Sequence, residues 1–245
     1  CSSDLTQRGQ RLFIQEAQIA RRLRHDNIVA VHDVSWTSEG ILYLSMEFLH
    51  GKSLRSLLRG QRESRRFLDV RLAVTVTAQI LAALDYAHKT VVHRDMKPEN
   101  VMILPGERVK VLDFGLAKAI DEEEVQPTAS EGRHKRRRVI GTLAYSAPEQ
   151  RLHRALDLRA DLYTVGLLLR EMLTLRTPMD EQVSVMDVRS DVAPSLVTVL
   201  ERALQSEKEL RWQSAGEFRT QLLKAYHESY RGASAVECAR QDGAT

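Results

Sequence analysis

Three side chains that could act together on one phosphoryl group lie between His93 and Asn100. Asp95 offers a carboxylate that accepts a proton, Lys97 offers a charged amine, and Asn100 offers an amide oxygen. A loop framed by two short strands could hold these three groups around a phosphoryl group in transfer. The plain alternative is a charged surface loop that carries no chemistry.

The elements that must position this loop follow from the spacing of apolar residues. Val70 to His88 predicts a long helix, because its apolar residues recur at helical spacing along one face. Brief apolar runs at Val91-Val92, Val101–Leu104 and Val109–Leu112 predict small strands around the loop. The loop is therefore expected to lie between the end of a buried helix and a small sheet.

The rest of the chain begins with strands and continues with helices, which indicates an α+β fold of two unequal lobes. The spacing predicts helices over Phe13–Leu23, Leu54–Leu58, Asp161–Thr174, Ser195–Gln205 and Ser214–Tyr230, and strands over Ile28–Val34 and Ile41–Phe48. Val183 to Arg189 allows at most about two helical turns. Ile120 to Arg138 is expected to be a mobile loop, and Arg231 to Thr245 a disordered tail.

The loop matches the pattern H-R-D-x-K-x-x-N, and two further motifs follow it. Asp113-Phe114-Gly115 matches D-F-G, and Ala147-Pro148-Glu149 matches A-P-E, with Gly141-Thr142 ahead of it. In this order they resemble the catalytic domain of the eukaryotic-type protein kinase family over nearly the whole chain. Lys97 is the choice of Ser/Thr kinases, and the motif style is similar to that of bacterial members.

The resemblance implies an enzyme that transfers the γ-phosphate of ATP to Ser or Thr hydroxyls of protein substrates, with Mg²⁺ as cofactor. Asp95 would accept the proton of the substrate hydroxyl, and Lys97 would neutralise charge on the γ-phosphate. Asn100 and Asp113 would be the Mg²⁺ ligands.

The resemblance also implies a nucleotide site. Glu16 is expected to pair with the ATP lysine of the family, and Met46 falls at the gatekeeper position. Glu47 and Leu49 fall on the hinge, whose backbone bonds adenine, and Met102 would form the floor beneath it. Taken alone, Glu16 would be a solvated helix residue, and both methionines would be ordinary core residues.

Other matched residues are implied to support the fold. Asp161 would anchor the backbone of the catalytic loop, and Arg211 would pair with Glu149. The motif residues His93, Phe114 and Gly115 are assigned structural roles as well.

Arg94 implies control by phosphorylation, because an arginine before the catalytic aspartate pairs with an activation-segment phosphate in this family. The predicted acceptors are Thr128 and Ser130, whereas Thr142 is expected to contact the catalytic residues. The alternative is a long solvated loop with Arg94 only structural. The basic run Arg133 to Arg138 could be read as a nucleic-acid patch, but a solvated loop is the preferred interpretation.

The sequence departs from the family pattern at its start. It contains no G-x-G-x-x-G and no V-A-I-K, and only 15 residues precede Glu16. We expect a piece of a complete kinase, with the first three strands of the small lobe absent. The predicted kinase domain is 1–230, with an N-terminal lobe over 1–50 and a mainly helical lobe over 51–230. A pseudokinase or scaffold is the alternative, and a small-molecule kinase is disfavoured by the A-P-E segment.

Composition excludes several other classes of protein. The 245 residues are 43% hydrophobic and 28% charged with a net charge of +3, which demands neither nucleic acid nor a membrane as partner. The apolar stretches predict no membrane-spanning segment. The two cysteines, Cys1 and Cys238, predict no disulfide framework, and a reducing cytoplasm is the expected compartment.

Overall fold

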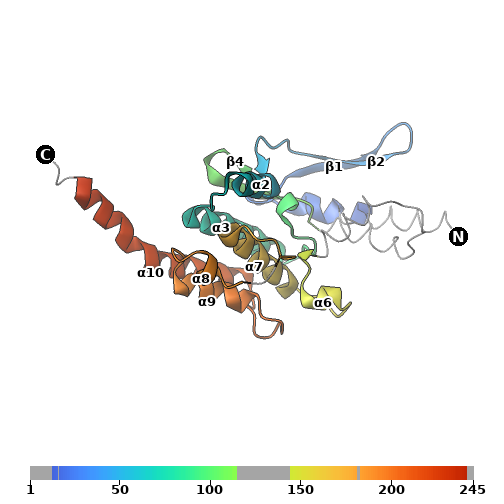
Figure 1. Cartoon of the computed structure of the whole chain (residues 1–245). Helices are drawn as coiled ribbons and strands as arrows, with labels where there is room; N and C mark the ends of the chain where they lie inside the picture. The colour runs from blue at the N-terminus through green and yellow to red at the C-terminus, as the bar shows by residue number, and fades with distance from the viewer. Residues whose placement is uncertain (1–12, 16, 115–143, 181–182, 242–245) are drawn as a thin grey trace.

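The computed structural model describes residues 13–15, 17–114, 144–180 and 183–241, and its architecture is α+β, as predicted (Figure 1). Residues 13–15 and 17–22 are helical. The elements that follow are β1 (Val31–Trp36), β2 (Leu42–Met46), β3 (Lys52–Ser53), α2 (Leu54–Ser64), α3 (Val70–Ala87), η1 (Pro98–Asn100), β4 (Val101–Leu104), η2 (Pro105–Glu107), β5 (Arg108–Val111), α6 (Pro148–Arg151), α7 (Arg159–Thr174), α8 (Val185–Val188), α9 (Pro194–Ala203) and α10 (Ala215–Gln241).

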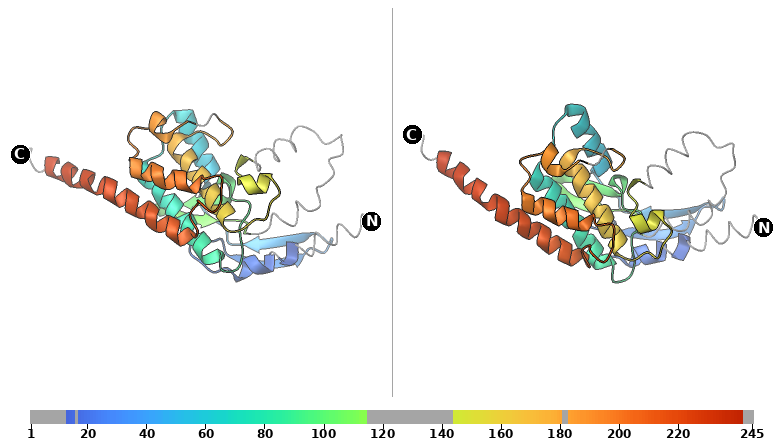
Figure 2. Two further views of the ribbon diagram at one scale, coloured as in Figure 1. Left: turned by 90° about the horizontal axis from the view of Figure 1, so that it is seen from below. Right: turned by 60° about the horizontal axis from the view of Figure 1, so that its bottom comes forward.

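Strands β1 and β2 form an antiparallel hairpin that lies beside the first helical residues (Figure 2). The register pairs Val31 with Met46, and one irregularity follows Val31. The turn is closed by the Thr37 hydroxyl, which accepts the Ile41 N–H at 3.1 Å. Gly40 stands in this turn at φ 78°, a conformation that glycine adopts without strain. The two strands predicted on either side of this turn therefore pair with each other.

Strands β3, β4 and β5 form a second antiparallel sheet next to the start of α2. The chain enters this sheet through Gly51, where a Cβ atom would lie 2.4 Å from the Ile103 carbonyl oxygen. Only a glycine allows this approach. Helix α2 begins directly afterwards, because the Ser53 side chain accepts the Ser56 N–H at 3.2 Å and caps the helix. The sheet and α2 are thus joined without a connecting loop.

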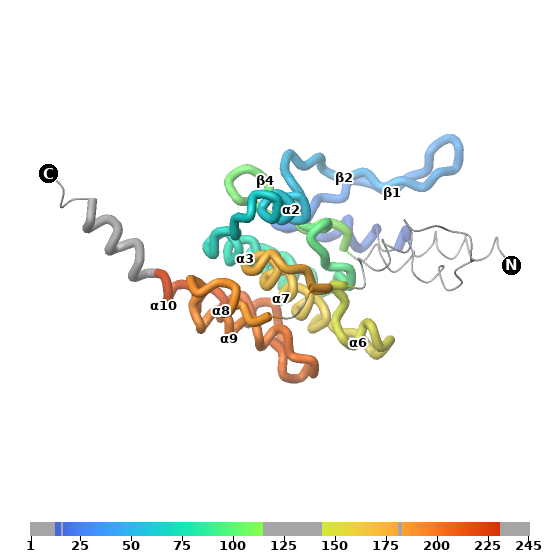
Figure 3. The backbone as a smooth tube through the Cα atoms, in the orientation of Figure 1, coloured from blue at the N-terminus to red at the C-terminus, as the bar shows by residue number. Residues whose placement is uncertain are grey.

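Helix α3 forms the centre of the helical region, where α7 and α10 pack against it (Figure 3). Its apolar residues lie on more than one face, and eleven of its eighteen residues are buried. A helix that is hydrophobic on most sides must be enclosed by other elements. Helix α9 packs against both α7 and α10 and completes the core.

The length and composition of α3 would also allow it to cross a membrane, although the sequence predicts no membrane-spanning segment. Over its 18 residues the mean hydropathy is 1.3, but 61% of these residues are buried inside the protein. The core helix of a globular domain has the same properties, so this is weak evidence for a membrane span. No other helix in the described part of the chain meets the same criteria.

Several predicted boundaries differ from the structure. The first strand begins at Val31 rather than Ile28, which forms only an isolated bridge to Val111. No strand forms at Val91-Val92, and α2 continues six residues beyond Leu58, to Ser64. Helix α10 extends to Gln241 where a disordered tail was predicted. Alanine, arginine, glutamate and glutamine dominate that last stretch, and all four have good helix propensity.

Candidate active site

The three side chains of the predicted catalytic cluster lie together between α3 and β4. The Lys97 ammonium is 2.5 Å from the Asp95 carboxylate. The Asn100 amide donates to the Asp95 carbonyl at 2.9 Å and to its carboxylate at 3.3 Å. Pro98 opens η1, and this single turn brings Asn100 back toward Asp95. Asp95 and Lys97 remain partly exposed, at 14% and 23%, so a substrate can reach them.

A single buried carboxylate holds the backbone of this loop. Asp161, at the start of α7, accepts the N–H groups of His93 at 2.7 Å and Arg94 at 2.8 Å. The His88 ring, at the end of α3, contacts the same carboxylate at 2.9 Å. Arg94 has φ 68°, which costs about 1 to 3 kcal/mol for a non-glycine residue, so the bonds to Asp161 must maintain it. The sequence analysis did not predict a role for His88. The one available signal was its position, five residues before His93 at the end of the predicted helix.

The rings of His93 and Phe114 connect the catalytic loop with the D-F-G segment. Their centroids are 4.7 Å apart, and both side chains are buried. The His93 Nε2 donates to the Leu112 carbonyl at 2.8 Å, while Nδ1 accepts the Asp95 N–H at 3.3 Å. The bond to Leu112 fixes the ring, and Nδ1 then fixes the backbone of Asp95.

Asp113 is a half-buried carboxylate beside the cluster. Burial, with a further contribution from the charge of Asp95, holds its pKa above the ordinary value, while His93 and Lys97 act in the opposite direction. Within the described part of the chain it forms no ion pair, and its backbone is left-handed at φ 57°. A buried carboxylate with this balance of charges is stabilised by a bound cation.

The oxygen atoms available at this site fit Mg²⁺. The Asn100 amide directs its NH₂ group at Asp95, so its carbonyl oxygen is available, and Asp113 contributes carboxylate oxygens. Mg²⁺ prefers such hard oxygen ligands and is bound through one or two carboxylates together with substrate phosphates. Among the described residues no group of three or more His, Cys, Asp or Glu side chains could hold a metal ion by itself.

The residues predicted for the nucleotide hinge lie where β2 ends. The Glu47 N–H donates to the Ala30 carbonyl at 2.9 Å, which ties the end of β2 to the residue before β1. Its carboxylate contacts the Lys110 ammonium at 2.7 Å. Burial raises the pKa of Glu47, but the bonds from Lys110 and the Ala30 N–H, together with nearby positive charge, lower it further, so the pKa lies below its ordinary value. Leu49 and Met102 are partly buried, and Met102 stands beside Lys110 in the register of β4 and β5.

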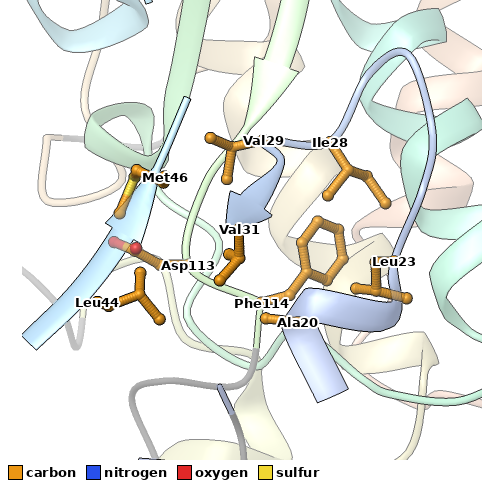
Figure 4. Close-up of a pocket in the computed structure, with 9 residues that line it drawn as sticks. All are labelled: Ala20, Leu23, Ile28, Val29, Val31, Leu44, Met46, Asp113 and Phe114. Atoms are coloured by element: carbon orange, nitrogen blue, oxygen red, sulfur yellow. The ribbon is translucent and has the colours of Figure 1, made fainter. Parts of the chain in front are cut away.

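Met46 lines a small cavity between β2 and the first helical residues (Figure 4). Leu44, Asp113 and Phe114 line it too, together with Ala20, Leu23, Ile28, Val29 and Val31. Its volume of about 10 Å³ is close to that of one water molecule. The gatekeeper, hinge and floor assignments stay predictions, and so does that of Glu16, which lies outside the described residues.

Glu149 and Arg211 form the ion pair expected between the A-P-E segment and the region before α10. The two N–O distances are 2.7 and 2.8 Å, and the Arg211 side chain is fully buried. Arg211 also donates to the carbonyl groups of Arg159, Gln205 and Ser206. All five N–H donors of the guanidinium are therefore used.

A second buried cluster was not anticipated from the sequence. The Glu171 carboxylate in α7 is completely buried and contacts the guanidinium groups of Arg55 and Arg62 and the hydroxyl of Tyr145. Arg55 also donates to Glu99 of the catalytic loop at 2.8 Å and to Tyr145 at 3.0 Å. This cluster joins α2, the catalytic loop and the segment before A-P-E. The only sequence signal for this cluster was the number of arginines in α2.

The predicted control residues are described only in part. Arg94 has a buried Nε without a hydrogen-bond partner among the described residues, and its carbonyl accepts from the Gln150 side chain at 2.8 Å. An unpaired guanidinium nitrogen is suited to an anionic partner. Thr128, Ser130, Thr142 and Gly115 lie outside the described residues, so phosphorylation there stays a prediction.

Comparison with known proteins identifies relatives over almost the whole chain. The protein kinase domain family model matches residues 2–234. A probable serine/threonine-protein kinase of Streptomyces coelicolor is 37% identical over 228 residues, which is 86% of this chain and 32% of that protein. The serine/threonine-protein kinase PknB of Mycobacterium tuberculosis is 36% identical over 235 residues, which is 88% of this chain and 36% of that protein. The chain thus spans about a third of the length of these relatives.

Solved structures lead to the same fold. The crystal structure of the PknI kinase domain of Mycobacterium tuberculosis superposes with a TM-score of 0.69 at 26% sequence identity. The match covers 89% of this chain and 79% of that domain. The predicted two-lobed architecture is thereby confirmed at the level of the fold.

Proposed function

The chain belongs to the protein kinase domain family, and on that premise we propose that the protein of which it forms part transfers the γ-phosphate of ATP to Ser or Thr hydroxyls of protein substrates. The observation that carries this proposal is the cluster of Asp95, Lys97 and Asn100 on a backbone fixed by Asp161. The names of the relatives support the choice of Ser and Thr as acceptors.

The proposed reaction divides the work among the residues of the cluster. Asp95 orients the substrate hydroxyl and takes its proton as the new O–P bond forms and the bond to the β-phosphate oxygen of ATP breaks. Lys97, held 2.5 Å from Asp95, supplies positive charge where negative charge increases. Asp113 and Asn100 would hold Mg²⁺, which neutralises phosphate charge when bound.

We propose a cytoplasmic location for the described domain, because the sequence has two cysteines and ATP is the proposed substrate. Protein substrates are the proposed partners. Neither nucleic acid nor a membrane is needed to explain the site.

The test is phosphate transfer by the full-length protein from labelled ATP to Ser/Thr peptides with Mg²⁺ present. We expect transfer by the wild type, none by Asp95→Asn, and unchanged transfer by the control Asp187→Asn, an exposed carboxylate on α8. ATP binding without any transfer by the wild type would overturn the proposal and favour a binding module.

A further inference from the structure

The acidic side chains next to the catalytic loop are already neutralised by the protein's own arginines. Glu99 accepts from the Arg55 Nε at 2.8 Å, and fully buried Glu171 contacts both Arg55 and Arg62. Asp95, in turn, is paired with Lys97. Glu99 and Glu171 each already have a cationic partner. A basic substrate could therefore bind them only by breaking an existing ion pair, which costs free energy.

Basic residues outnumber acidic residues in and around α2. From Lys52 to Arg66 the chain has six basic residues and one acidic residue, whereas the whole chain has a net charge of only +3. Lys52 is exposed and has no side-chain partner among the described residues. Arg59 is 72% exposed, and within the described part of the chain its side chain has one ion pair, a loose 3.9 Å contact with Glu63. These cations remain available to a ligand.

A third exposed cation, Arg176, lies just after the end of α7. The Arg62 Nε donates to the Leu175 carbonyl at 2.7 Å, so Arg176 follows directly beside α2. Arg176 is exposed, and its side chain has no partner among the described residues. Figure 2 shows α2 beside α7 at one end of the helical region. Lys52, Arg59 and Arg176 are called the basic strip below.

Local helix stability does not explain the strip. Arg55, Arg59 and Arg62 follow each other at intervals of four and three residues, so they lie on one stripe of α2. Like charges at this spacing destabilise a helix by about 0.2 to 0.5 kcal/mol per pair. Arg55 and Arg62 are compensated by Glu99 and Glu171, whereas Arg59 gains little from its distant partner.

We propose that the basic strip binds an acidic segment of the protein substrate, next to the Ser or Thr that Asp95 receives. This inference rests on the proposed kinase function and names its substrate class. Arg59 lies one helical turn, about 6 Å, beyond Arg55, which touches the catalytic loop. An extended peptide advances about 3.3 Å per residue, so acidic residues within a few positions of the hydroxyl reach the strip.

The first measurement is binding, which does not depend on catalysis. Three fluorescent peptides share one central Thr and differ in the flanking residues, which are Asp and Glu, the isosteric Asn and Gln, or Lys. Fluorescence anisotropy with the full-length protein should give a Kd about three- to tenfold lower for the acidic peptide than for its amide counterpart, because each exposed charge pair contributes a factor of roughly 1.5 to 5. The preference should weaken at 0.5 M salt.

Variants locate the effect on the surface. The double substitution Arg59→Glu, Arg176→Glu should abolish the preference for the acidic peptide and leave binding of the amide peptide unchanged. Arg219→Glu, at an exposed position on α10, is the matched control and should keep the preference. Equal binding of the acidic and amide peptides, preference for the lysine peptide, or loss of preference in the control would overturn the inference. Absence of phosphate transfer together with preserved acidic binding would instead contradict only the kinase function.

Discussion

Replacing Arg211 by methionine tests the most completely satisfied buried group in the described structure. The fully buried guanidinium makes two bonds to the Glu149 carboxylate and three to backbone carbonyls. Methionine keeps the unbranched stem but removes every donor. Glu149, with a side chain only 8% exposed, is then left as a buried charge without its partner.

The expected cost follows from that geometry. Breaking a buried ion pair by removing one partner costs about 3 to 5 kcal/mol of unfolding free energy, because the remaining charge stays desolvated. The double variant Arg211→Met, Glu149→Gln should lose less than Arg211→Met alone, since the isolated charge is gone. Arg219→Met on the surface of α10 is the control and should change stability by less than about 0.5 kcal/mol.

The effect of Glu149 on the free energy of unfolding should change with pH in a defined direction. In the wild type, burial raises the pKa of Glu149, but the bonds and charge of Arg211, together with a backbone hydrogen bond, lower it further, so the pKa lies below its ordinary value of 4.5. A lowered pKa means that Glu149 stabilises the fold above about pH 4.5 and that this contribution is lost only as the pH falls further. In Arg211→Met the bonds and the charge of Arg211 are gone, whereas burial and the nearby charge of Asp157 still raise the pKa of Glu149 against one backbone hydrogen bond. We therefore expect this pKa to rise, so that protonation relieves the isolated charge at a higher pH than in the wild type.

Urea unfolding of wild type and Arg211→Met at pH 7, 6 and 5 measures this difference. We expect the gap in unfolding free energy to be largest at pH 7 and to shrink toward pH 5. Carboxylates that both proteins share cancel in the comparison. A gap that is below 1 kcal/mol at pH 7, or that does not shrink toward pH 5, would refute the reasoning.

Three further predictions concern the catalytic loop and the small sheet. Asp113→Asn should weaken Mg·ATP binding in calorimetry, whereas Asp95→Asn should leave it unchanged, and an equal loss in both would contradict the division of roles. Asp161→Asn presents an NH₂ group to the N–H donors of His93 and Arg94, so we expect a loss of about 1 to 3 kcal/mol in urea unfolding and lower activity. Gly51→Ala places a Cβ against the Ile103 carbonyl and should cost about 1 to 3 kcal/mol, whereas Gly60→Ala has open space in α2 and should stabilise it; equal thermal shifts would argue against this account.

Elements with strong local signals were predicted well. Helix α3 was expected from Val70 to His88 and ends one residue earlier, and β4 spans Val101–Leu104 as expected. In both cases apolar periodicity and burial agree. The strand predicted at Val91-Val92 failed, because two apolar residues that join α3 to the catalytic loop have no neighbouring strand with which to pair.

The contacts that organise the site were predicted only where a motif marked both partners. Asp161 and the Glu149–Arg211 pair fall in recognised motifs, and the structure places both where the family pattern implies. Glu171 carries no such mark, because its partner Arg62 lies 109 residues away in sequence. Periodicity reports which face of a helix is buried, but it does not report which distant side chains meet there.

Helix α7 gives the two buried carboxylates of the site a common support. Asp161 fixes the catalytic-loop backbone, and Glu171, ten residues later, fixes Arg55 and Tyr145. At 1.5 Å per residue the two points are about 15 Å apart along one rigid element. The distance between the reacting cluster and the segment before A-P-E is therefore set by a helix rather than by loops. A flexible segment would instead have to lose conformational entropy each time a substrate bound.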